Sequence, residues 1–250
     1  MSDAMDAEFD TVASWTADAA AELGPDHFVA AGCRGSGGPA TFDLLLDALE
    51  VRDGAALLDV GAGVGGPAAY AQRSRGVRPV LVDPEAGACR AARRLFGLPT
   101  IRADGLVLPF ADGAFDAVWS LGVLCTTPDH VTALTELRRV LADDGRLALL
   151  VYVAVDALPE QPDGNTFPAD HELHRDIATA RLSVLDERDM VLAADESDRW
   201  QEQVDAVECR LDRRHSDHPA WTTAQEQSAI IGRLLSGGQL RGRLLSLRSS

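Results

Sequence analysis

The stretch from Leu57 to Gly66 has the residue types and spacing of a nucleotide-cofactor site. Its first half is typical of a buried β-strand ending at Asp59 and Val60, and a helix is expected to begin at about Pro67. Glycines between the two allow bare backbone to approach a ligand. Two fingerprints fit these glycines: the dinucleotide pattern Gly61-x-Gly63-x-x-Gly66 and a pattern led by a carboxylate, Asp59-x-Gly61-x-Gly63-x-Gly65. Taken alone, the glycines do not decide which cofactor binds.

Carboxylates also stand at the ends of the next two expected strands. Asp83 ends the apolar run that begins at Val80, a place where a carboxylate can accept both ribose hydroxyls of a nucleotide. Asp104 follows the third strand and can accept from an adenine amino group, with the backbone of Gly105 alongside. Asp59 must find donors or a cation, because a carboxylate at the end of an apolar strand is costly when unpaired. Three carboxylates favour a cationic cofactor, whereas a pyrophosphate would be repelled.

From Asp59 to Val153 the chain resembles the class I S-adenosylmethionine-dependent methyltransferases, close to the group that includes ubiquinone and menaquinone methyltransferases. The resemblance lies in four landmarks in the family's order: the glycine turn, the Val80 to Glu85 segment, the Ile101 to Val118 segment and the Leu141 to Val151 segment. It implies an α/β fold with a Rossmann-like seven-stranded, mostly parallel sheet, helices on both faces and a helical cap over the acceptor site. The last strand is expected to lie antiparallel between the fifth and sixth strands.

The resemblance also implies the cofactor, S-adenosylmethionine, and its product, S-adenosylhomocysteine. Asp59 would order the glycine turn and face the ammonium end of the cofactor. The implied cofactor-binding residues are Asp59, Gly61, Ala62, Gly63, Gly65, Asp83, Pro84, Asp104, Gly105, Ser120 and Leu121. To these we add Arg34, which is flanked by a glycine-rich link and can clamp a carboxylate of the methionine moiety or of the acceptor. An exposed arginine in a flexible link is the alternative interpretation.

Methyl transfer depends mainly on proximity and orientation, because the methyl group is displaced in line by a nucleophile. A hydroxyl acceptor also needs a base, whereas an amine needs only to be unprotonated. Many relatives carry a His after the fourth strand, but the matching segment here, Ser120 to Pro128, has none. His171 and His174 are the candidate catalytic bases, since the segment after the fifth strand often borders the acceptor. Their spacing can also recruit a metal or simply belong to a surface turn, and no metal is assigned.

Composition narrows the possible partners. The formal net charge is -16, and arginine supplies all 23 basic residues. Such a chain repels nucleic acid and anionic membranes, and Arg90, Arg93 and Arg94 are too short a run to indicate more than a solvated helix face. A small-molecule acceptor is therefore expected, with no nucleic acid and no membrane. The four cysteines lack paired spacing and no signal peptide or long apolar span is evident, which indicates a cytoplasmic setting.

Three regions are expected to position these residues within one domain. Residues 1–52 form an N-terminal helical cap segment that contains a polar, glycine-rich link, 53–155 form the cofactor-binding core, and 156–250 supply the last strands with a helical cap insertion. Helices within 196–235 would roof the acceptor pocket. We predict S-adenosylmethionine-dependent methyl transfer to a small organic acceptor of specialised metabolism. The alternatives are an NAD(P)-dependent oxidoreductase and a non-catalytic S-adenosylmethionine-binding protein.

Overall fold

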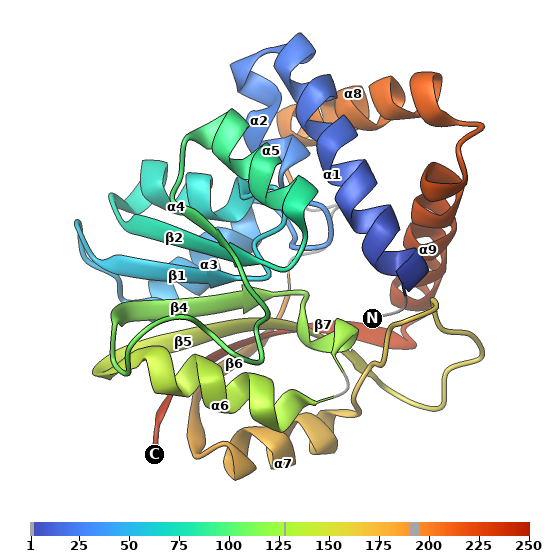
Figure 1. The fold of residues 1–250 in the computed structure, drawn as a ribbon. Helices are drawn as coiled ribbons and strands as arrows, with labels where there is room; N and C mark the ends of the chain where they lie inside the picture. Colours follow the sequence, from blue (N-terminus) through green and yellow to red (C-terminus); the bar gives the residue numbers. More distant parts are fainter. Residues whose placement is uncertain (1–2, 128, 191–195) are drawn as a thin grey trace.

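The computed structural model describes residues 3–127, 129–190 and 196–250, and its centre is one seven-stranded sheet (Figure 1). The strand order is β3-β2-β1-β4-β5-β7-β6. All neighbours are parallel except β7, which pairs antiparallel with both β5 and β6 as predicted. The strands are β1 Ala56–Val60, β2 Arg78–Asp83, β3 Thr100–Arg102, β4 Phe115–Leu121, β5 Leu141–Ala154, β6 Leu182–Asp189 and β7 Leu240–Ser249.

Helices cover both faces of the sheet, because the central strands are apolar on both sides. Leu57 and Trp119 face one layer and are fully buried, whereas Leu58 and Val118 face the other and are also fully buried. The first layer contains α3 (Pro39–Leu49), α4 (Gly66–Arg75) and α5 (Ala86–Phe96), and the second contains α6 (His130–Val140) and α7 (Asp170–Thr179) (Figure 1). The alternating apolar runs of the sequence thus fold into a three-layer core.

A helical cap lies over the carboxyl edge of this sheet. It consists of α1 (Asp3–Leu23), α2 (Phe28–Ala31), α8 (Asp198–His215) and α9 (Pro219–Ser236), with short 3-10 turns at Pro25–His27 and, after β4, at Leu124–Thr126. In Figure 1, α8 and α9 stand beside α1, although most of the chain separates them in sequence. Glu22 of α1 pairs with Arg210 and Arg214 of α8 at 2.6 and 2.7 Å. The predicted fold class, including the cap, is confirmed.

No helix within the described ranges is both long enough and apolar enough to cross a membrane.

The glycine-rich link between α2 and α3 packs directly on the glycine turn that follows β1. The backbone nitrogen of Gly66 donates to the carbonyl of Gly32 at 3.1 Å, and Cys33 and Ser36 of the link are buried. A Cβ atom on Gly32 would lie 2.5 Å from that nitrogen. The sequence predicted a polar link that brings Arg34 to the cofactor site, but not this backbone packing, because contact between two bare backbones leaves no spacing pattern. The link therefore forms part of the site rather than a connection outside it.

Replacing Gly32 with Ala is expected to lower the free energy of unfolding by about 1–3 kcal/mol, because the added methyl group meets backbone that cannot rotate away. Gly232→Ala on α9 is the matched control: its Cβ would meet open space, and helix propensity should raise the free energy of unfolding by about 0.5–1 kcal/mol. Urea denaturation measures both values. Equal effects of the two substitutions would contradict this account of the link.

Candidate cofactor site

A cavity of about 450 Å³ lies between the carboxyl edge of the sheet and the cap. The turns after β1, β2 and β4 form its floor, because the carboxyl ends of parallel strands meet at one edge of a sheet. Helices α1 and α9 and the link before α3 form its walls. Its lining includes Asp59, Gly61, Ala62, Gly63, Asp83, Pro84, Leu121 and Arg34, all of which were predicted to bind the cofactor.

The glycine turn presents backbone to this cavity. Gly61 has φ +75, and a Cβ atom there would lie 2.3 Å from a methyl group of Val123, so only glycine fits. Gly63 also has a positive φ, +54, but open space lies beside it. The turn thus joins β1 to α4 while leaving one side of its backbone uncovered, which is the shape that a flat cofactor requires.

Asp83 holds the first two turns together. Its Oδ2 accepts from the backbone nitrogen of Gly63 at 2.7 Å, and its Oδ1 accepts from that of Glu85 at 2.9 Å. Burial raises the pKa of this carboxyl, although both backbone donors oppose the shift. Each carboxylate oxygen has a further lone pair, so Asp83 can also accept from ligand hydroxyls.

Asp59 lies deeper, at the end of β1, and only 2% of its surface is exposed. Its Oδ2 has no hydrogen-bond partner among the described residues. Burial raises the pKa of Asp59 to about 7; the nearby indole of Trp119 opposes this shift, and the charge of Asp83 adds to it. A buried carboxylate with an unpaired oxygen is costly until a cation or donor reaches it. This part of the cavity therefore fits a positively charged group.

Four predicted cofactor residues do not line the cavity. Gly65 packs against Leu81 at the start of α4, and Ser120 donates to the carbonyl of Val60 at 3.0 Å, which ties β4 to β1. Asp104 is exposed and accepts from the backbone nitrogen of Leu106 at 2.9 Å, within its own turn. Gly105 lies beside Val60. These four residues support the strand ends and turns around the cavity but do not contact its interior.

Arg34 reaches the cavity, but its partners belong to the protein. One guanidinium nitrogen, Nη1, donates to Oε1 of Glu8 at 2.8 Å, and Nη2 donates to the carbonyl of Ala224 at 3.3 Å. Glu8 is almost fully buried. The predicted carboxylate clamp thus holds a carboxylate of α1 and fastens the link to α1 and α9.

His171 and His174 lie on α7, which packs against α6, β5 and β6 on the other face of the sheet (Figure 1). His171 is exposed, and Nε2 of His174 lies 3.1 Å from a carboxylate oxygen of Glu187. The carbonyl of Asp170 and then Glu187 raise the pKa of His174. Neither histidine lines the cavity, because the chain after β5 crosses to the far face before α7 begins. The structure does not bring the predicted bases to the site.

Two further ionisable groups of the lining, Cys125 and Tyr152, are poor bases. Burial raises the pKa of the Cys125 thiol to about 12 and also raises that of Tyr152, whose hydroxyl donates to the carbonyl of Gly35 at 3.2 Å. Gln227 of α9, which sequence reasoning did not single out, is 9% exposed and lines the cavity without a hydrogen-bond partner among the described residues. No sequence signal distinguishes it from any other polar residue on a cap helix.

Comparison with known proteins places the core in a family. Residues 58–149 match the family model of the methyltransferase domain. The chain is similar to the 27-O-demethylrifamycin SV methyltransferase of Amycolatopsis mediterranei, with 28% identity over 74% of this chain and 66% of that protein. It is also similar to the demethylmenaquinone methyltransferase of Beutenbergia cavernae, with 40% identity over 43% of this chain and 45% of that protein. The chain spans about half the length of the curated relatives it matches, from 36% to 66%.

Among solved structures, the fold is similar to that of the cyclase SpnF, with a TM-score of 0.67 and 22% identity over 83% of this chain and 79% of that chain. The strand order, the glycine turn and the family match define a class I methyltransferase domain. Residues 58–149 thus form a methyltransferase domain, and the relatives support a class I S-adenosylmethionine-dependent methyltransferase of the small-molecule type. The predicted family is confirmed, and its methyl donor is the cofactor predicted from the sequence. The matches do not support an NAD(P)-dependent oxidoreductase.

Asp59→Asn is expected to stabilise the unliganded protein at high pH. The folded-state pKa of about 7 lies above the ordinary value of 3.8, so ionisation destabilises the fold. The stability that the protonated carboxyl contributes is fully present below pH 4 and is lost as the pH rises to about 7. The difference in free energy of unfolding between variant and wild type should therefore grow by roughly 1 kcal/mol per pH unit over this range and then level off. Urea denaturation at pH 5, 6, 7 and 8 measures it, and a pH-independent difference would contradict the assignment.

Proposed function

We propose that this protein transfers a methyl group from S-adenosylmethionine to a small organic acceptor of specialised metabolism. The observation that carries the proposal is the buried Asp59 carboxylate, whose unpaired oxygen lies at the glycine turn within a cavity closed by helices. A cationic cofactor relieves the cost of that carboxylate, whereas a pyrophosphate would increase it.

Each part of the cavity suits one part of this cofactor. Asp59 would meet the ammonium end, the backbone from Gly61 to Gly63 would lie along the middle, and Asp83 would accept from the ribose hydroxyls. Asp104 and Gly105, which lie at the outer edge after β3, would border the adenine. When bound, S-adenosylmethionine supplies an electrophilic methyl group on its sulfonium. The protein's own residues fix its position through contacts that already exist between the turns.

The proposed transfer relies on orientation of donor and acceptor and does not use Cys125, Tyr152 or a histidine as a base. Cys125 and Tyr152 keep their protons at neutral pH, and no histidine stands among the described lining residues. Helices α1 and α9 line the cavity above its floor, and contacts with a partly buried ligand are stronger there than in bulk water. An acceptor whose nucleophile is a neutral amine or an acidic group that is already ionised needs no general base from the protein.

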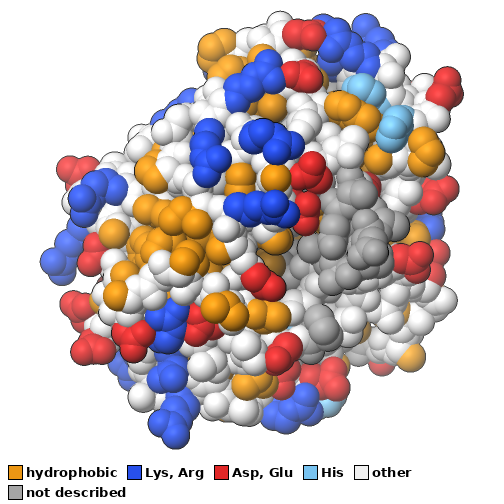
Figure 2. Space-filling view, viewed as in Figure 1, with side chains coloured by type: hydrophobic (Ala, Val, Ile, Leu, Met, Phe, Trp, Pro, Cys, Tyr) orange, Lys and Arg blue, Asp and Glu red, His pale blue; other side chains and the backbone are white. Residues whose placement is uncertain are grey.

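A small-molecule acceptor is also supported by the relatives and by the surface. The two relatives named above act, by their names, on 27-O-demethylrifamycin SV and on demethylmenaquinone. On the face shown in Figure 2, arginine and acidic side chains lie side by side. Arg94 pairs with Asp18 at 2.5 Å and Arg90 with Asp10 at 3.6 Å, which neutralises most of the short basic run of α5. We therefore propose no nucleic-acid or membrane partner and a cytoplasmic location for a single catalytic unit.

Calorimetry tests the cofactor assignment. Purified protein should bind S-adenosylhomocysteine with a dissociation constant of about 1–100 μM, a typical range for a buried polar ligand, and should not bind NADH or NADPH. Asp83→Asn should weaken binding at least tenfold, because charge-assisted hydrogen bonds to the ribose are lost. Exposed Asp104→Asn should have a smaller effect. Folded protein that takes up no S-adenosylhomocysteine would refute the proposal, and binding without methylation of any acceptor would favour a non-catalytic role.

A further inference from the structure

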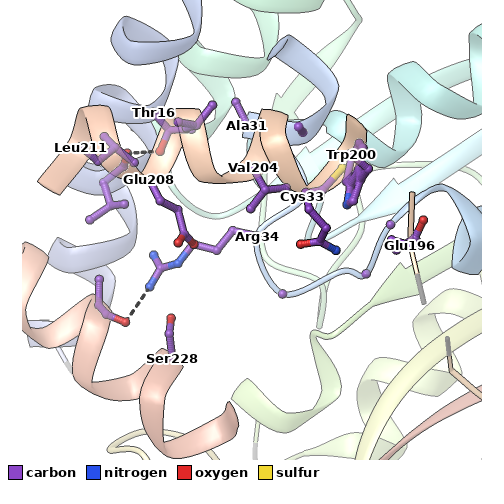
Figure 3. Close-up of a pocket in the computed structure, with 18 of the residues that line it drawn as sticks. Thr16, Ala31, Cys33, Arg34, Glu196, Trp200, Val204, Glu208, Leu211 and Ser228 are labelled. Carbon is purple, nitrogen blue, oxygen red and sulfur yellow. Dashed lines mark hydrogen bonds between the residues drawn. The ribbon is translucent and has the colours of Figure 1, made fainter. Parts of the chain in front are cut away.

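A second chamber of about 340 Å³ adjoins the cofactor cavity. The two share Arg34, Gly35 and Tyr152 in their linings, so the chamber opens from the cavity behind the link. Figure 3 shows it between α8, α9 and the link. Its walls are mainly apolar and aromatic, and they include Val204, Val207, Leu211, Trp200 and Trp221. Trp200 and Trp221 are both largely buried.

The chamber also holds a negative charge that the protein does not neutralise. Arg34 and Glu208 lie side by side in it (Figure 3), but the guanidinium of Arg34 is already paired with buried Glu8 at 2.8 Å. Glu208 forms no hydrogen bond or ion pair with the described residues, and desolvation and then the charge of Asp205 raise its pKa, although nearby Arg34 opposes this shift. Two carboxylates thus face one guanidinium.

The other carboxylate in the wall is already satisfied. Oε1 of Glu196 accepts from the backbone nitrogen of Ala40 at 3.1 Å, at the first turn of α3. The positive end of that helix offsets its charge. Glu208 is therefore the group through which the chamber selects the charge of its occupant.

We propose that this chamber is the acceptor site and that it selects an acceptor with an apolar body and a basic amine, held as an ammonium beside Glu208. The inference rests on the proposed methyl transfer and adds the substrate class to it. Apolar walls favour an apolar body, and an uncompensated carboxylate in a partly desolvated chamber favours a cation. An acceptor carboxylate would meet Glu208 and find Arg34 already engaged by Glu8.

Recognition of the amine does not depend on which atom receives the methyl group. The amine contributes binding energy in the chamber. The nucleophile is the acceptor atom that reaches the methyl group in the cofactor cavity.

Three probes of one shape and different charge test this inference: 4-phenylbutylamine, 4-phenylbutan-1-ol and 4-phenylbutyrate. Binding of each is measured by calorimetry on protein saturated with S-adenosylhomocysteine at pH 7.5. The amine should bind about tenfold more tightly than the alcohol, and the carboxylate should bind most weakly. Glu208→Gln should lower the affinity for the amine about tenfold and leave that for the alcohol unchanged. Glu202→Gln, on the same helix but outside the chamber lining, is the matched control and should change neither.

Equal affinities for amine and alcohol in the wild type would overturn the inference, as would an equal loss of both in Glu208→Gln. Binding of S-adenosylhomocysteine is measured first in every variant. If it fails in the wild type, the proposed function fails, whereas normal cofactor binding without a preference for the amine refutes the chamber assignment alone.

Discussion

The buried carboxylate at the end of β1 is the constraint on which the site depends. Asp59 lies where the sheet, the glycine turn and the cap meet, and its unpaired oxygen leaves the unliganded protein with an unfavourable charge. Asp83 accepts one hydrogen bond from Gly63 of the same turn and another from Glu85, and so fixes the turns after β1 and β2 to each other. The protein thus accepts a local loss of stability at the position where a cation must bind, and the surrounding core is large enough to tolerate it.

The cap turns this strand-end site into an enclosed one. It is built from α1 and α2 at one end of the chain and from α8 and α9 near the other. Ion pairs of Glu22 with Arg210 and Arg214 and a hydrogen bond from Arg34 to the carbonyl of Ala224 join the two parts. Arg34 lines both the cofactor cavity and the second chamber. Donor and acceptor are therefore brought together by segments that lie outside the strand-helix core, which suits a reaction that depends on orientation.

This division explains why the family match identifies the cofactor-binding core but does not identify the acceptor. The family match covers residues 58–149, which hold the strand ends and the glycine turn, whereas Glu208 and Gln227 belong to cap helices outside it. Solved structures with this fold include one described as a cyclase, so the core alone does not specify what happens to an acceptor. The chemistry that selects the acceptor resides in the side chains of the cap.

The sequence by itself determined the order of strands and turns, the three carboxylates at strand ends and the presence of roof helices, because these follow from local periodicity and from motifs a few residues long. It could not determine which helix faces meet. The pairing of Arg34 with Glu8, the packing of Gly32 on Gly66 and the placement of His171 and His174 on the far face all depend on contacts between distant segments. Periodicity shows that one face of a helix is buried, but only the tertiary structure determines which segments pack against that face.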